Sequence, residues 1–163
     1  MTWDAALRCA AWLAFLMWAG AEASLAVEWN RLARWLWTIG VLGLACHMAT
    51  AFHSRYHWSH AVAYLDTAEK TGAVTGIRWG GGVWINYVML TVWSIDAGIA
   101  WIRGAAAWAG MRRTALRWVF AFIWSQGAVV FPKGPLRWGA AFVLVLLAVW
   151  VWHQWRRRRL LWR

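Results

Sequence analysis

The chain has few acidic residues, few prolines and few cysteines, and these shortages narrow what it can be. Its 163 residues include six Asp or Glu, two Pro and two Cys. Two cysteines, Cys9 and Cys46, cannot make a disulfide framework, and both lie in apolar stretches where free cysteine is common. Only 14% of the residues are charged and 63% are hydrophobic. A soluble domain of this size is therefore excluded, because it needs more polar residues to cover its surface.

Nucleotide-binding and nucleophilic motifs are also absent. Neither GxGxxG nor GxxxxGK[ST] occurs, and the glycines at 80–82 precede an apolar run with no adjacent lysine, so a phosphate cradle is not expected. We expect these glycines to permit a tight return to the bilayer through unusual backbone angles. Ser59 lies beside His57 and His60, but residues one or two apart on a helix point in different directions. The sequence assigns no catalytic residue and leaves open whether the chain is an enzyme.

What the chain does have is a series of long apolar runs. About 20 apolar residues in a helix cross the roughly 30 Å of bilayer hydrocarbon. We therefore predict an all-α fold, an integral membrane helical bundle of about five transmembrane helices in a single domain, 1–163. The predicted spans are 9–27, 33–53, 83–103, 114–131 and 136–155. Between the second and third spans, 54–82 is predicted to hold a His-rich outer helix that extends the second span, followed by a Gly-rich loop.

The distribution of Lys and Arg predicts the orientation. With five spans the termini lie on opposite sides, and eleven of the 17 Lys and Arg then fall on the C-terminal side. The positive-inside rule places the C-terminus in the cytoplasm, with the N-terminus and the His-rich loop outside, in a multi-pass protein of the cell inner membrane. A cleaved signal peptide ending near 19–23 would leave four spans and export the arginine tail, so an uncleaved chain is favoured.

The formal charge of +11 does not indicate nucleic-acid binding, because the arginines flank apolar spans and form no basic groove. Juxtamembrane arginines attract anionic lipid headgroups at about 1 kcal/mol per residue. We expect this role for the four arginines after the last span, Arg156, Arg157, Arg158 and Arg159. Beyond the lipid bilayer, the expected partner is another membrane protein or a second copy of the chain.

Four of the five histidines fall within 46–71. If this stretch is one continuous helix, His53, His57 and His60 stand at i, i+4 and i+7 on one face. Imidazoles with this spacing supply neighbouring ligands to zinc, copper or iron. The pattern predicts a transition-metal site at the outer membrane edge, and hence a metal-binding or redox-linked membrane subunit.

Hydrogen-bonding neighbours are expected to orient the imidazole rings, and the candidates are Tyr64, Thr67 and Asn86. Haem is disfavoured because His153, the one histidine outside the stretch, lies at the opposite end of its span. The alternative hypothesis is a histidine seam that binds a protein partner without metal, in a structural or accessory membrane subunit.

Polar residues inside the predicted spans fall into two layers by depth. The inner layer holds Glu22 and Asp96, and the outer layer holds His47, Asn86 and Gln126. Ionisable groups in hydrocarbon are costly, so they normally turn toward the bundle interior and pair.

Two hypotheses follow for the intramembrane carboxyl groups. One is a proton path through His47, Glu22 and Asp96 in a small proton-coupled transporter. The other is a structural role, in which the carboxyl groups are protonated and hydrogen-bond between helices, or are neutralised by Arg34 or Arg103.

Two segments, WSHAVAYLDTA at 58–68 and WGGGVWINY at 79–87, together resemble a family of uncharacterised bacterial multi-span membrane proteins. The similarity covers the central third of the chain. The resemblance implies no activity and no catalytic residue. It implies that the His-rich helix, the Gly-rich loop and the Asn86-Tyr87 pair act as one unit.

Overall fold

A computed structural model of the chain describes residues 3–130 and 134–161, and their side chains except those of 155 and 157–161. These residues form helices joined by short turns, with no strand among them. The elements are α1 (Trp3–Ala26), α2 (Asn30–Ser54), α3 (His60–Thr75), α4 (Gly82–Arg103), the 3-10 turn η1 (Gly104–Trp108), α5 (Gly110–Ser125), the π turn η2 (Gln126–Val130) and α6 (Leu136–Leu161). The prediction of an all-α helical bundle is confirmed.

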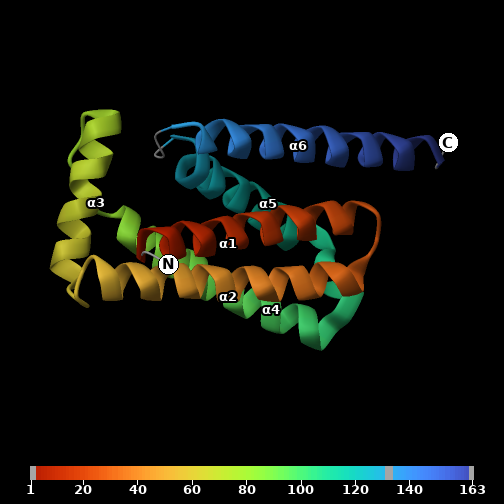
Figure 1. The fold of residues 1–163 in the computed structure, drawn as a ribbon. Helices are drawn as coiled ribbons and strands as arrows, with labels where there is room; N and C mark the ends of the chain where they lie inside the picture. The colour runs from red at the N-terminus through yellow and green to blue at the C-terminus, as the bar shows by residue number, and fades with distance from the viewer. Residues whose placement is uncertain (1–2, 131–133, 162–163) are drawn as a thin grey trace.

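The helices run back and forth between two ends of an elongated bundle (Figure 1). α1 and α2 form an antiparallel hairpin, α4 packs on α2, and α6 packs on α1 and η2. α3 lies across one end, which we call the α3 end, together with the start of α1 and the start of α6. The turn between α1 and α2, η1 and the end of α6 lie at the other end, which we call the η1 end. The first and last described residues therefore lie at opposite ends.

Four helical segments are long and apolar enough to cross a membrane: Trp3–Ala26, Asn30–Ser54, Gly82–Trp108 and Leu136–Gln154. They identify the chain as a helical membrane protein. The fifth predicted span, 114–131, is not among them. It corresponds to α5 and η2, and α5 has 16 residues, three of them arginines; residue 131 lies outside the described residues. α5 nevertheless runs from the η1 end back toward the α3 end (Figure 1).

Tryptophan fills the centre of the bundle. Trp18, Trp37 and Trp93 are each at most 1% exposed. Trp93 packs edge-on against Trp37 and Phe120, with ring centroids 5.2 Å and 5.1 Å away. Such edge-to-face contacts add to the dispersion energy of packing. Glycine makes room for this packing at Gly40, where a Cβ would lie 2.6 Å from the Trp93 ring.

The prediction of one continuous helix from 46 to 71 is wrong. α2 ends at Ser54 and α3 begins at His60. Between them, His57 and Trp58 adopt left-handed backbone angles, with φ of 45° and 61°, which no α-helix contains. Ser59 is the N-cap of α3, and its hydroxyl accepts a hydrogen bond from the Val62 amide at 3.3 Å. Serine is favoured at this position because it satisfies an amide that the new helix leaves open.

Candidate functional site

The three histidines predicted as metal ligands lie in three different settings. His53 is in the last turn of α2, where its ring packs on that of Trp3 with centroids 5.0 Å apart. His57 is exposed in the break. His60 starts α3, and its Nδ1 is hydrogen-bonded to the Tyr87 hydroxyl at 2.9 Å. In the described part of the chain no three His, Cys, Asp or Glu side chains come together to hold a metal ion. The prediction that His53, His57 and His60 share one helix face is therefore wrong, and metal binding stays a prediction from sequence.

The residues expected to orient the imidazoles do not do so. Thr67 donates its hydroxyl proton to a backbone carbonyl one turn earlier, and Asn86 and Tyr64 are exposed. The side chain that is hydrogen-bonded to one of these histidines is that of Tyr87, which neighbours Asn86 in sequence but lies on a different face of α4. The Tyr87 hydroxyl, which bonds to His60 just after the break between α2 and α3, is the hydrogen-bonding group that was not singled out from the sequence.

An aromatic cluster fixes α3 to the rest of the bundle. Phe52, at the end of α2, is 9% exposed. Its ring lies 5.2 Å from that of His60, 5.5 Å from that of Tyr56 and 6.2 Å from that of Tyr87, measured between centroids. Elements that are separate in sequence (α2, the break, α3 and α4) thus meet around one phenyl ring.

A polar contact reinforces this cluster. The Tyr56 hydroxyl donates a hydrogen bond of 2.7 Å to the carboxylate of Asp66, and Lys70 donates one of 2.5 Å to the same oxygen. Burial opposes ionisation of Asp66, but the hydrogen bonds from Lys70 and Tyr56 outweigh it and lower its pKa. Burial, together with the bond to Asp66, raises the pKa of Tyr56 above its usual value. Asp66 is therefore ionised and Tyr56 protonated at neutral pH.

Asp66→Asn is expected to loosen α3. A lowered pKa means that ionised Asp66 stabilises the anchored state, an effect present above about pH 4 and lost as the pH falls through the folded-state pKa. A nitroxide at Ala73→Cys, with Cys9 and Cys46 replaced by serine, measures this. We expect a several-fold larger mobile fraction in the variant at pH 7, and in the parent chain only below about pH 4.

The control for this prediction is Glu69→Gln. Glu69 and Arg78 are 3.7 Å apart and both are mostly exposed, so their ion pair contributes little. Equal nitroxide mobility in the Asp66 and Glu69 variants would contradict an anchoring role for Asp66.

The Gly-rich loop connects α3 to α4 and passes close to the backbone of α3. A Cβ at Gly80 would collide with the backbone of Tyr64, so the loop passes directly against α3 only because residue 80 is glycine. The expected unusual backbone angles are not found at 80–82. Within the described residues, the loop glycine with positive φ is Gly76, the C-cap of α3, at 79°.

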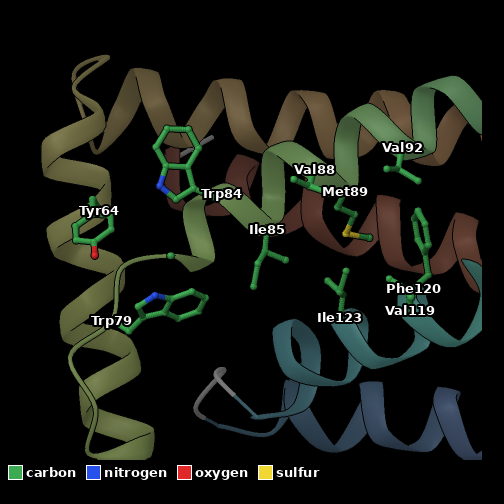
Figure 2. A pocket seen from close by; sticks show the side chains of 11 residues that line it. Tyr64, Trp79, Trp84, Ile85, Val88, Met89, Val92, Val119, Phe120 and Ile123 are labelled. Carbon is green, nitrogen blue, oxygen red and sulfur yellow. The ribbon is translucent and has the colours of Figure 1, made fainter.

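An apolar cavity of about 490 Å³ lies below this loop, between α3, α4 and α5. Figure 2 shows Tyr64 and Trp79 at one end and Val119 and Phe120 at the other, with α4 side chains along the wall. No charged side chain lines it among the described residues. The cavity has the character of a lipid-facing groove and supplies no reactive group.

A buried ion cluster lies toward the η1 end. Glu22 of α1 is 1% exposed and Asp96 of α4 is 2% exposed. Arg113 of α5 forms an ion pair with Glu22, and Arg117, one turn later, donates from Nε to the other oxygen of Glu22 at 2.8 Å. Arg112 forms an ion pair with Asp96. The cluster therefore connects α5 to both α1 and α4.

Three arginines face two carboxylates, so one positive charge is left over in formal terms. Aromatic faces offset it: the Arg113 guanidinium carbon lies 4.4 Å from the Trp37 ring centroid and 5.0 Å from that of Trp108. Cation–π contacts of this kind are strongest when water is excluded, and Arg113 is 2% exposed. This arrangement stabilises a fixed position of α5.

The predicted neutralising partners of the carboxyl groups were the wrong arginines. Arg34 lies over the Trp101 ring at 4.7 Å, and Arg103 is exposed. The partners are instead Arg112, Arg113 and Arg117 of α5. Arg113 and Arg117, which pair with Glu22, lie 91 and 95 residues after it in the sequence. Three arginines on one otherwise apolar helix were the signal that could have found them.

The outer polar residues lie apart from this cluster. The Nδ1 atom of His47 is 3.0 Å from the carbonyl oxygen of Leu7, which ties α2 to α1. Gln126 begins η2 and its amide donates to the Ser125 hydroxyl at 3.4 Å. No hydrogen bond among the described residues joins His47 to Glu22 or Asp96, and the proton-path hypothesis stays a prediction.

Comparisons with protein families, with known proteins and with solved structures give no match.

Proposed function

We propose that the chain is a structural, accessory subunit of a membrane protein complex, and that residues 54–81, here called the α3 cap, dock a partner protein. The observation that carries this proposal is an exposed apolar stripe on the cap. Trp58, Val62 and Leu65 are 64%, 46% and 58% exposed. Ala63 and Ala68, the two buried residues of α3, pack against the bundle.

Helix geometry supports an outward-facing stripe. Ala63 and Ala68 lie about 140° apart around the helix, and the direction midway between them is about 130° from Leu65 and about 170° from Val62. The stripe therefore points away from the middle of the packed face. α3 lies across the bundle end (Figure 1); because its buried residues pack on the bundle, we infer that the stripe points out of the bundle. Exposed apolar residues grouped on a surface are typical of a protein interface.

The buried charges favour an accessory role over transport. Glu22 and Asp96 each have an arginine partner on α5, and such pairs hold helices in place. An acid that is paired with a buried arginine is poorly placed to exchange its proton, because protonation would leave the guanidinium uncompensated. At the α3 end, the polar contacts of Asp66 with Tyr56 and Lys70 and of His60 with Tyr87 anchor the cap.

The charge distribution supports the placement of the cap. The predicted orientation places the α3 cap on the non-cytoplasmic face of the inner membrane. At the other end, Arg156 packs against the Trp152 ring at 5.9 Å, a position from which it can reach anionic headgroups. The side chains of Arg157, Arg158 and Arg159, predicted for the same role, lie outside the described residues.

Photo-crosslinking in native membranes tests the docking proposal. A photoreactive residue at Leu65 is expected to give a discrete protein adduct that Val62→Glu abolishes. The matched control is Val145 on α6, which is 59% exposed and faces lipid, where we expect lipid adducts alone. Lipid adducts alone at Leu65 as well would overturn the proposal and identify α3 as a headgroup-layer helix.

A further inference from the structure

A second cavity at the α3 end combines an apolar interior with a cation. It lies between α1, η2 and the start of α6 and has a volume of about 390 Å³, within the range of ligand pockets, roughly 300–1,000 Å³. Trp12, Phe15 and Trp124 form its aromatic wall, and Arg8 lies at its edge. A more open groove, also lined by Arg8 and Trp12, continues from it toward the start of α1.

Small residues create this cavity. Ala11 of α1 contributes one side, and Gly127 and Ala128 of the π turn η2 contribute another. π turns widen a helix locally and are frequent at functional sites. At Gly127 an added Cβ would meet no atom within 4 Å, so open space lies beside the turn.

The Arg8 charge is free to meet an external anion. Arg8 is exposed, and across the described residues its side chain makes no hydrogen bond or ion pair. Asp4 lines the open groove together with Arg8 and interacts with it electrostatically, but its hydrogen-bonded ion pair, at 2.7 Å, is with Arg55. The cavity of Figure 2, by contrast, has no charged group in its described lining.

The depths of Arg8 and of the aromatic wall in the membrane fit an amphiphilic ligand. Arg8 lies five residues into α1, about 7.5 Å from the helix start, and Phe15 lies about 10 Å deeper along the axis. With the predicted span beginning at residue 9, the cation is at headgroup depth, and the aromatic wall extends into the hydrocarbon. A ligand that matches both has a negative headgroup and an apolar tail.

We propose that this cavity binds one anionic phospholipid of the surrounding bilayer, with its phosphate at Arg8 and an acyl chain against Trp12, Phe15 and Trp124. The site is separate from the α3 cap and does not depend on the proposed docking function. The lipid fills space between α1, η2 and α6 that the described residues leave open.

Native mass spectrometry of the full chain in detergent tests this site. The protein receives equal amounts of phosphatidylglycerol and phosphatidylcholine with identical chains. We expect about fivefold preferential retention of phosphatidylglycerol, the equivalent of about 1 kcal/mol for one arginine. Arg8→Gln is expected to abolish the preference, and Ala11→Phe, which fills the cavity, to lower retention of both lipids severalfold.

Arg78→Gln is the matched control, because Arg78 is an exposed arginine in the α3 cap that does not line the cavity; this variant is expected to keep the preference. Since Arg8 is exposed, its variant is expected to fold, so the test does not depend on Ala11→Phe. Equal phosphatidylglycerol preference in the parent and in Arg8→Gln would overturn the proposal. Displacement of both lipids by palmitate, with no preference between them, would also overturn it.

Discussion

Glu22→Gln is expected to destabilise the folded bundle by about 3–5 kcal/mol. The Glu22 side chain is 2% exposed and pairs with both Arg113 and Arg117. Glutamine keeps the shape but removes the charge, so it leaves guanidinium groups uncompensated in a site that excludes water. Reversible unfolding in mixed detergent micelles, followed by helical circular dichroism, measures the change in the free energy of unfolding.

Two comparisons isolate the charge effect. Glu28→Gln, at the exposed turn between α1 and α2, is expected to change stability by less than about 0.5 kcal/mol. Replacing Glu22, Arg113 and Arg117 together by leucine is expected to recover most of the loss, because a buried ion cluster and an apolar one of similar volume are often close in stability. If Glu22→Gln is as stable as Glu28→Gln, the cluster is not a stabilising element.

The ion cluster also accounts for the low apolar content of α5, which is not among the helices long and apolar enough to cross a membrane. Its arginines are expensive in hydrocarbon, yet Arg112 and Arg113 reach carboxylates on two different helices. α5 is therefore compatible with the bundle interior only after α1 and α4 are in place. Its position depends on tertiary pairing, which a search for long apolar runs does not detect.

The long helices could be predicted because the bilayer imposes their length and composition. Runs of apolar residues with few charges have one stable conformation in hydrocarbon, since every backbone group must be satisfied within the segment. This reasoning identified the regions of α1, α2, α4 and α6. This prediction did not depend on which residues are in contact, so it could be made without knowing how the helices pack.

The break at 55–59 could not be predicted from histidine spacing. The i, i+4, i+7 pattern assumes a helix and cannot test that assumption. His57 and Trp58 have left-handed φ angles. The Trp58 amide donates a hydrogen bond to the Phe52 carbonyl oxygen at 3.0 Å, and the Trp58 ring lies 6.2 Å from the Phe52 ring. A non-glycine residue adopts such angles only where its surroundings compensate for the strain.

The partner of a buried charge is equally hard to predict. The sequence predicts that Glu22 and Asp96 are either protonated or neutralised by an arginine, and Arg34 and Arg103 are the arginines that it places nearby. The actual partners come from a helix about 90 residues away from Glu22. Which helices are neighbours is a property of the tertiary packing, and one sequence without packing information leaves several pairings open.

Trp93→Ala is expected to cost about 3 kcal/mol or more, since it removes a large buried ring from a tightly packed site. Trp93 is fully buried against Trp37 and Phe120, and within a membrane the loss is one of dispersion and cavity formation. The same unfolding measurement reports it. Trp84→Ala, on the same helix but 60% exposed, is the control and is expected to cost less than about 1 kcal/mol.

Gly40 gives this prediction a sharper form. An added Cβ at Gly40 would lie 2.6 Å from the Trp93 ring, so Gly40→Ala is expected to cost about 1–3 kcal/mol by overpacking. In the Trp93→Ala background the ring is gone, and the same methyl group partly fills the cavity. We therefore expect Gly40→Ala to be neutral or stabilising there. Additive losses in the double variant would contradict direct packing of the tryptophan on the glycine, since only residues in contact couple this strongly.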